Sequence, residues 1–497
     1  MKAATQRAAV GAVATALIAG LAGCSLSGDP SAKEGAPGAK KAPAPKAAPQ
    51  LIGDGSTAYT GAQPKQLKPK RLKPGQKPPQ FVVFSWDGAG EDSQKLFSHF
   101  RSVGRKYDMT MTYFLSGVYL LPEEKASLYL PPKHAAGRSD IGFNDLTGIK
   151  DTVRELRGAW QEGNEVGTHF NGHFCGPEGG DSWSVEDWKS EINQAKSFVK
   201  NWRTNSGLKD EASLPFDYEK ELVGGRTPCL EGRKNFVKAA SELGFRYDTS
   251  GINDQIWPEK ELGVWDLGLQ MVPFPGRGFE TLSMDYNFMV NQSGTVKGDP
   301  AQHDYWGGQM RDGLIQAFDR AYNGNRAPLI IGNHFESWNG GTYMRAIEDT
   351  IATVCVKKDV ECVSFKQLAD WLDAQDPKVL AELRTLPVGQ APKAGWPAFM
   401  GGMKAGPAGR PAGPGADAEP GTEARAEDAD SGSDEGAGSG SGSDEGAGSG
   451  SGSGSDEEAE AADSASGADG SGAPESGAGG VLAAPAVAPV VRPAAAR

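Results

Sequence analysis

Apolar stretches that end in polar residues recur through the middle of the chain. Residues 81–86 form an apolar run bounded by Pro79 and Gly88, which is typical of a strand buried on both faces. Residues 93–107 have a helical pattern, and residues 109–115 form a second apolar run. A strand, a helix and a strand within about 35 residues predict a βαβ unit with parallel strands.

The same alternation continues to about residue 374, which predicts an α/β domain built on a parallel sheet. Ser184, followed three residues later by Asp187, predicts the N-terminal cap of one of its helices. Further helices are expected at residues 147–162, 184–202, 234–243, 344–356 and 365–374, and further strands at residues 165–168, 222–228, 245–248, 327–334 and 361–364.

Polar, chemically active side chains repeatedly follow these predicted strands. Parallel α/β folds build their sites from the carboxyl ends of the strands and the loops that follow them. We therefore expect these side chains to meet at one end of the sheet. They are Asp87, His169, His173, Arg226, Asp248 and His334.

Two of these residues, His169 and His173, are four positions apart, and the chain contains only 6 histidines in 497 residues. Imidazole is the commonest metal-binding side chain, and two from one short segment reduce the ordering needed to form a site. Two polar residues at the edge of a loop would show the same spacing. The pair is therefore a candidate metal site that depends on its neighbours.

The formal net charge of −13 is unevenly distributed. Residues 25–77 carry +7, residues 401–497 carry −12, and the predicted folded region carries −10. Because phosphate binding needs a basic surface, an acidic folded region argues against nucleic acid as a partner.

Residues 1–24 have the pattern of an export signal. Lys2 and Arg7 precede an apolar segment that is too short and too rich in alanine and glycine for a good membrane span. The segment ends in Leu-Ala-Gly-Cys, which resembles the bacterial lipobox, and an ordinary secretory signal is the alternative. We expect lipidation of Cys24 and an extracytoplasmic location, anchored to the bacterial cell membrane.

The regions that flank the predicted domain are biased in composition. Residues 25–77 are rich in proline, lysine and alanine, and we expect an extended linker whose positive charge attracts anionic lipid or wall polymer, or which is only a solvated spacer. Residues 387–497 are dominated by glycine, serine, alanine and acidic residues, which predicts disorder. The folded domain is therefore expected at residues 78–386.

Four further cysteines remain after Cys24, and export would favour their oxidation. Four cysteines allow three pairings. We expect the pairs Cys175–Cys229 and Cys355–Cys362. No Cys-x2-Cys pair is present, so metal binding by these cysteines is less favoured.

These residues make the sequence resemble the NodB-like polysaccharide deacetylases (carbohydrate esterase family 4) over roughly residues 80–375. Residues 226–230 and 243–250 look closest to the chitin deacetylase-like branch. The resemblance implies a distorted (β/α)7 barrel. It also implies hydrolysis of N- or O-acetyl groups on a peptidoglycan or chitin-like glycan, with a divalent metal that is most often Zn²⁺. We expect a monomer.

The resemblance assigns roles to individual residues. Residues 84–88 occupy the position of the family's Thr-Phe-Asp-Asp-Gly motif, which makes Asp87 a metal ligand together with His169 and His173. Arg226 and Pro228 match the Arg-x-Pro motif, whose arginine orients the catalytic carboxylate, and Pro228 would contact substrate. His334 matches the histidine that acts as general acid.

The sequence departs from the family at Trp86, which stands where the family has its catalytic base, an aspartate. Indole cannot accept a proton at neutral pH, and loss of a positioned base typically costs about 10²–10⁴-fold in rate. Another carboxylate would have to replace it, with Asp248 as the expected residue and Glu91, Asp92 and Glu336 as alternatives. Otherwise the metal-bound hydroxide alone would support slow hydrolysis, or the domain would bind metal and glycan without turnover, with Trp86 stacked on a sugar ring.

Overall fold

The computed structural model of this chain describes residues 49–401 and 491–493. The chain divides into two units, residues 1–47 and 48–497, and all of the described residues belong to the second. The predicted signal segment 1–24, Cys24 and nearly all of the tail after residue 401 lie outside the described residues.

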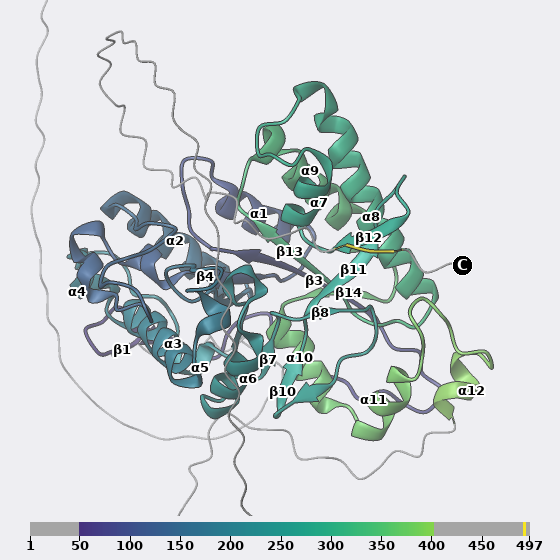
Figure 1. The fold of residues 1–497 in the computed structure, drawn as a ribbon. Coiled ribbons are helices and arrows are strands. Elements are labelled where there is room, and N and C mark those ends of the chain that lie inside the picture. Colours follow the sequence, from purple (N-terminus) through teal and green to yellow (C-terminus); the bar gives the residue numbers. More distant parts are fainter. Residues whose placement is uncertain (1–48, 402–490, 494–497) are drawn as a thin grey trace, which may run out of the picture. The chain divides into compact units, whose positions relative to one another are not determined.

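The predicted α/β class is confirmed, because helices surround a curled, mostly parallel sheet of nine strands (Figure 1). Its strands follow the order β13-β3-β4-β5-β6-β7-β10-β9, and β14 also pairs with β3. All pairings are parallel except that of β9 with β10. The strands are β3 (Gln80–Asp87), β4 (Thr112–Leu115), β5 (Glu165–Thr168), β6 (Gly224–Gly225), β7 (Tyr247–Asp248), β9 (Lys260–Glu261), β10 (Val264–Asp266), β13 (Leu329–His334) and β14 (Val360–Val363).

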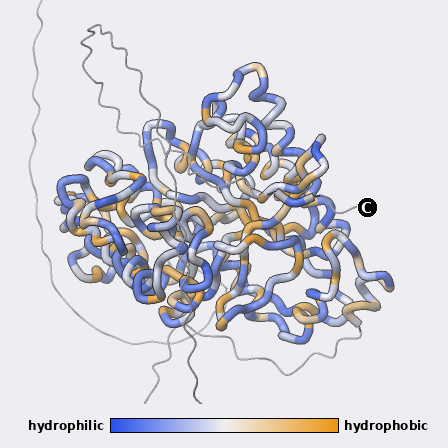
Figure 2. The backbone as a smooth tube through the Cα atoms, in the orientation of Figure 1, coloured by the Kyte–Doolittle hydropathy of each residue, from blue (hydrophilic) through white to orange (hydrophobic). Residues whose placement is uncertain are grey.

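Strand β3 is the centre of this sheet, and every one of its residues is buried. It pairs with β13 along six residues, with β14 at its beginning and with β4 at its end. Figure 2 shows hydrophobic residues concentrated along these central strands. A strand enclosed on both sides and both faces explains the uninterrupted apolar run that the sequence showed.

The helices cover this sheet, and two of them begin with capping boxes. Ser184 and Asp187 cap α3, and Ser364 and Gln367 cap α10, so the backbone N–H groups of the first turn are satisfied. The helices are α1 (Leu96–Lys106), α2 (Leu146–Gln161), α3 (Val185–Lys200), α4 (Trp202–Ser206), α5 (Tyr218–Glu221), α6 (Arg233–Glu242), α7 (Asp285–Gln292), α8 (His303–Asn323), α9 (Trp338–Val354), α10 (Phe365–Ala374), α11 (Pro377–Arg384) and α12 (Trp396–Gly401). None of the described helices is long and apolar enough to cross a bilayer.

A second, smaller sheet is built mainly from the region between residues 249 and 327, for which the sequence pattern predicted no elements, and is joined by one strand from near the end of the chain. It consists of β8 (Ile252–Asn253), β11 (Leu269–Pro273), β12 (Phe279–Leu282) and β15 (Val491–Pro493). Ser283, just after β12, donates its hydroxyl hydrogen to the carbonyl of Ile330 in β13. This contact ties the small sheet to the strand that carries His334.

The predicted linker 25–77 is too long, because residues 49–77 pack onto the domain. Strands β1 (Gln50–Ile52) and β2 (Thr57–Tyr59) form an antiparallel pair. Ser56 between them is fully buried, and its carbonyl accepts a hydrogen bond of 2.8 Å from the indole N–H of Trp202. The segment is held by hydrogen bonds of this kind rather than by a large apolar surface, so composition alone does not reveal it.

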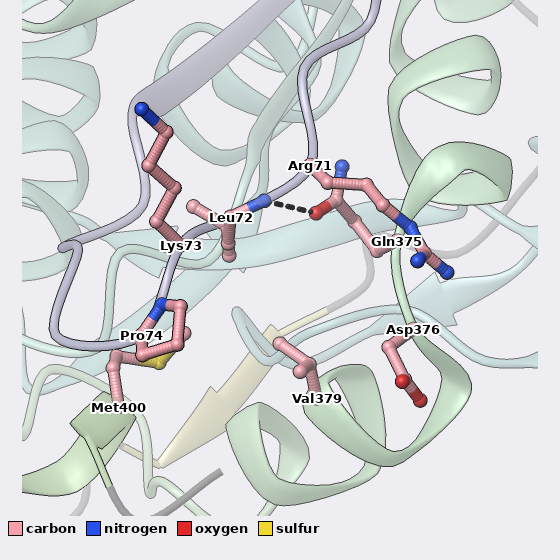
Figure 3. Close-up of a pocket in the computed structure, with 8 residues that line it drawn as sticks. All are labelled: Arg71, Leu72, Lys73, Pro74, Gln375, Asp376, Val379 and Met400. Atoms are coloured by element: carbon pink, nitrogen blue, oxygen red, sulfur yellow. Dashed lines mark hydrogen bonds between the residues drawn. The ribbon is translucent and has the colours of Figure 1, made fainter. Parts of the chain in front are cut away.

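The predicted domain end at residue 386 is too early for a related reason. Helix α12 follows it, and Met400 in this helix is 1% exposed. Met400 closes a small pocket with residues of the N-terminal segment and of α11 (Figure 3). The folded part therefore extends from about residue 49 to 401.

Candidate active site

Asp87 and His334 occupy paired positions at the carboxyl ends of two neighbouring strands. His334, the last residue of β13, is in register with Asp87, the last residue of β3. Side chains at paired positions of adjacent strands point to the same face of a sheet. The ends of β3 and β13 therefore place a carboxylate and an imidazole side by side.

Arg226, which follows β6, holds the carboxylate of Asp87. Its Nη1 donates a hydrogen bond of 2.7 Å to Oδ1 of Asp87, and both side chains are almost completely buried. Burial alone would raise the pKa of Asp87, but Arg226, with help from His169 and His334, lowers it below its usual value. Arg226 is fixed in turn by Thr249, whose carbonyl and hydroxyl oxygens accept from its Nε and Nη2.

His169 follows β5 and is oriented by the same arginine. Its Nδ1–H donates to the main-chain carbonyl of Arg226 at 2.8 Å, so Nε2 remains as a lone-pair acceptor. Burial lowers the pKa of His169 below its usual value, despite the attraction of Asp87. A neutral imidazole whose other nitrogen is bound to a carbonyl is the form in which histidine ligates metals.

His173 completes the pair at the far side of a tight loop. Its backbone adopts a positive φ of 58°, and its ring centroid lies 5.0 Å from that of His169 at an interplanar angle of 59°. Burial, together with His169 and His334, lowers the pKa of His173 to about 3. This imidazole is therefore also neutral at physiological pH.

A buried network braces the loop that carries both histidines. Asn171 donates from Nδ2 to Oε2 of Glu191 at 2.5 Å, and the hydroxyl of Tyr129 donates to Oε1 at 2.8 Å. The same hydroxyl accepts from the backbone N–H of Gly172 at 3.0 Å. Burial raises the pKa of Glu191 to about 7. No sequence pattern indicated this network, which fixes the loop that carries His169 and His173.

The donor chemistry of the two imidazoles fits a divalent metal. The donor atoms of the predicted triad, Asp87, His169 and His173, however, do not cluster around one position. Among the described residues, the one group of three potential ligands with donor atoms within 4.8 Å of one another is His173, Cys175 and Cys229. The two cysteines are joined as a disulfide, so they offer no thiolate. Asp87, whose Oδ1 is engaged by Arg226, does not belong to such a group.

His334 is part of a dyad whose second member the sequence did not reveal. Asp285, the first residue of α7, is fully buried and accepts from Nδ1 of His334 at 2.8 Å and from its backbone N–H at 2.8 Å. Burial lowers the pKa of His334, but Asp285 outweighs it and leaves the pKa above its usual value. An imidazole that keeps its proton is suited to general acid catalysis.

Glu336 lies two residues beyond this dyad, at the rim of the site. Burial raises its pKa to about 7, which His334 partly opposes and Asp285 and Asp92 reinforce. Among the carboxylates considered as substitute bases, Glu336 therefore interacts electrostatically with His334. Glu91 instead accepts a hydrogen bond at Oε2 from the backbone N–H of Ser98 in α1.

The expectation that Trp86 contacts substrate is wrong in this structure. Successive residues of a strand face opposite sides, so Trp86 faces away from Asp87 and packs under α1. Its ring is 0% exposed and lies 4.7 Å from Phe100, 5.7 Å from Tyr113 and 5.6 Å from Phe335. An indole enclosed by three aromatic rings has no free face for a sugar.

Asp248 is not a substitute base either. Its carboxylate accepts from Nε of Arg233 at 2.6 Å and from the backbone N–H of Ser250 at 2.8 Å. Burial raises its pKa to about 6, against the effect of Arg233. Pro228 is buried in the turn after Arg226, and its contact with substrate stays a prediction.

Both expected disulfides are present as bonds in the structure. Cys175 is joined to Cys229 across 54 residues, and Cys355 is joined to Cys362 across 7 residues. The first links the loop after the histidine pair to the turn after Arg226. It therefore fixes the two segments that orient His173 and Asp87.

Comparisons with known proteins locate the chain among distant structural neighbours only. No family model matches the sequence, and no curated protein matches it. A polysaccharide deacetylase structure from Mycobacterium smegmatis has 16% identity and a TM-score of 0.38, and the match covers 61% of this chain and 94% of that one. A carbohydrate esterase family 4 pseudoenzyme from Bacillus anthracis has 11% identity, a TM-score of 0.32, and coverage of 61% and 70%. A family 4 acetyl xylan esterase from Clostridium thermocellum has 12% identity, a TM-score of 0.33, and coverage of 60% and 96%.

Proposed function

We propose that this chain is a hydrolase of the polysaccharide deacetylase type, which removes acetyl groups from a cell-envelope or chitin-like glycan. The observation that carries the proposal is the pairing of two groups with opposite proton preferences. Asp87, with its pKa lowered mainly by Arg226, and His334, with its pKa raised mainly by Asp285, stand at paired positions of adjacent strands.

Asp87 then takes the role of general base, which changes the role that the sequence predicted for it. The family resemblance assigns the arginine at position 226 to the catalytic carboxylate, and Arg226 binds Asp87. Asp87 accepts a proton from the water that attacks the acetyl carbonyl. His334 donates a proton to the leaving amine or alkoxide, and Asp285 holds the ring in the orientation for this transfer. The base therefore comes from residue 87, and Trp86 serves the core.

His169 and His173 are the residues that would hold a divalent cation, with Zn²⁺ as the expected metal. Their neutral imidazoles and the hydrogen bond from Nδ1 of His169 to the Arg226 carbonyl favour this assignment. A bound cation would polarise the acetyl carbonyl and make a nearby water more acidic. Arg226 links the two parts of the site, because its guanidinium holds Asp87 while its carbonyl orients His169.

Glycan binding without turnover on the same scaffold is a second function that one observation favours. The donor atoms of Asp87, His169 and His173 do not all lie within 4.8 Å of one another among the described residues. A site with only two imidazole ligands binds metal more weakly than the three-ligand sites of most zinc enzymes.

Release of acetate separates the two functions. The full chain is incubated with acetylated chito-oligosaccharides and with peptidoglycan in the presence of Zn²⁺. We expect acetate release that falls by at least about 10²-fold in Asp87→Asn and in His334→Asn. Retained glycan binding by the wild-type chain with no acetate release would establish the binding function instead.

We also propose that the protein acts outside the cytoplasm, attached to the cell membrane through a lipid on Cys24. The apolar segment that ends in Leu-Ala-Gly-Cys and the two cystine bridges support this location. Labelling of the expressed chain with a radioactive fatty acid, lost on Cys24→Ala, tests the attachment.

A further inference from the structure

A basic strap crosses the end of the domain that is opposite to the active site. Residues 63–79 contain six basic and no acidic residues, although the chain as a whole carries −13. The strap leads directly into Gln80, the first residue of β3, whereas Asp87 is the last. At about 3.3 Å per residue, the strap lies roughly 25 Å from the catalytic carboxylate.

The strap is fixed to the domain through its main chain and through Arg71, whose Nε donates to the carbonyl of Ala374 at 2.9 Å, and its lysine side chains stay at the surface. The backbone N–H of Leu72 donates to Oε1 of Gln375 at 2.9 Å, and Nε2 of Gln375 donates to the carbonyl of Lys70 at 3.1 Å. In Figure 3 the side chain of Lys73 extends away from Gln375 and Val379. Lys68, Lys70, Lys73 and Lys77 are all exposed.

The disulfide-closed loop 355–362 continues this basic surface. Nζ of Lys77 lies 5.7 Å from the ring centroid of Tyr322, whose hydroxyl donates to the carbonyl of Lys358 at 2.9 Å. Lys357 and Lys358 are exposed at the tip of the loop. The basic face is therefore defined as Lys68, Lys70, Lys73, Lys77, Lys357 and Lys358.

Apolar side chains stand among these lysines. Val356, next to Lys357, is 66% exposed, and Leu67, next to Lys68, is 42% exposed. Acidic groups close to the face are Asp359 and Glu361 on the same loop and Asp376, which lines a pocket together with Lys73 (Figure 3), and they are fewer than the lysines. Cations mixed with protruding apolar side chains fit an anionic bilayer better than a purely polar polyanion, because the apolar groups enter the headgroup region.

We propose that the basic face docks on the surface of a bilayer that contains anionic lipids. Docking through this end of the domain leaves the ends of β3 and β13, and therefore the active site, directed away from the lipid and toward the surrounding glycan. The docking does not depend on turnover at the site, nor on lipidation of Cys24.

The test uses the full chain with Cys24→Ala, so that no lipid is attached, and measures sedimentation with vesicles. The vesicles consist of phosphatidylcholine alone or of phosphatidylcholine with phosphatidylglycerol. We expect binding to the anionic vesicles that weakens with salt. Replacing Lys68, Lys73, Lys77 and Lys357 by glutamine should lower the affinity at least about tenfold, and Val356→Ser should lower it further.

A matched control replaces four exposed lysines away from the face, Lys125, Lys209, Lys234 and Lys238, by glutamine. The control has the same net charge as the face variant and should bind as the parent chain does. Equal losses in both variants, or equal binding to vesicles without anionic lipid, would overturn the proposal. Tighter binding to soluble polyphosphate than to anionic vesicles would overturn it in favour of a polyanion. Unchanged thermal unfolding of both variants excludes misfolding as the cause.

Discussion

Trp86→Asp is the substitution that would restore the family motif, and the structure predicts that it unfolds the protein instead. Trp86 is 0% exposed and packs against Phe100, Tyr113 and Phe335. Its side chain faces away from Asp87 along β3. A carboxylate at this position would enter the aromatic core under α1 and would not reach the active site.

The magnitude follows from two separate costs. Removing a buried tryptophan side chain from a core destabilises a protein by about 3–5 kcal/mol. The new aspartate must also be buried in its neutral form, and protonating a carboxyl group at pH 7 costs about 4 kcal/mol. The sum of about 7–9 kcal/mol lies within the whole stability of a typical domain, about 5–15 kcal/mol.

The assay is urea unfolding followed by circular dichroism, together with acetate release by the same samples. Trp86→Phe is the control, because the indole N–H has no hydrogen-bond partner among the described residues and phenylalanine keeps an aromatic ring. We expect near wild-type unfolding for Trp86→Phe and an unfolded or strongly destabilised Trp86→Asp. A Trp86→Asp protein that folds within about 1 kcal/mol of wild type and releases acetate faster would refute the reasoning.

Three further predictions concern the parts that hold the site together. Asp285→Asn should lower kcat by about 10–100-fold. It should also move the alkaline fall of the rate to lower pH, because Asp285 keeps the pKa of His334 raised. An unchanged pH–rate profile would contradict this. Burial raises the pKa of Glu191 to about 7 in the folded protein, above the ordinary value of a glutamate. The protein should therefore lose stability as the pH rises from about 4.5 to 7, by on the order of 3 kcal/mol, and Glu191→Gln should flatten this dependence in urea unfolding. Replacing both Cys175 and Cys229 by serine should lower the free energy of unfolding by about 4 kcal/mol, and replacing both Cys355 and Cys362 should lower it by about 2–3 kcal/mol. The first disulfide costs more to lose because it closes a loop of 54 residues, whereas the second closes one of 7. Equal losses would argue against this loop-entropy explanation.

The sequence pattern located the sheet well because its central strands are buried on both faces. Phe81 to Phe84 are each at most 1% exposed, so the run of apolar residues directly reflects burial. The strand-end rule also selected Asp87, His169 and His334, which the structure brings into electrostatic contact with one another. Parallel strands force their carboxyl ends to one edge, so this part of the site follows from topology alone.

Other parts of the site depend on information that a linear pattern lacks. Asp285 is the first residue of a short helix in a region without clear periodicity, and its pairing with His334 spans 49 residues. The side to which Trp86 points depends on the register of β3, since one residue separates the core face from the site face. The segment 49–77 is held by hydrogen bonds of its main chain and of scattered polar side chains, which no hydrophobic pattern records.

The metal content of the Asp87→Asn protein, compared with that of His169→Ala, tests the assignment of roles most directly. Each full chain is loaded with Zn²⁺, dialysed and measured by atomic emission, and acetate release is recorded on the same sample. We expect that Asp87→Asn keeps its zinc and loses turnover, whereas His169→Ala loses both. Loss of zinc from Asp87→Asn to the same extent as from His169→Ala would show that Asp87 is a metal ligand, and would contradict its role as the base.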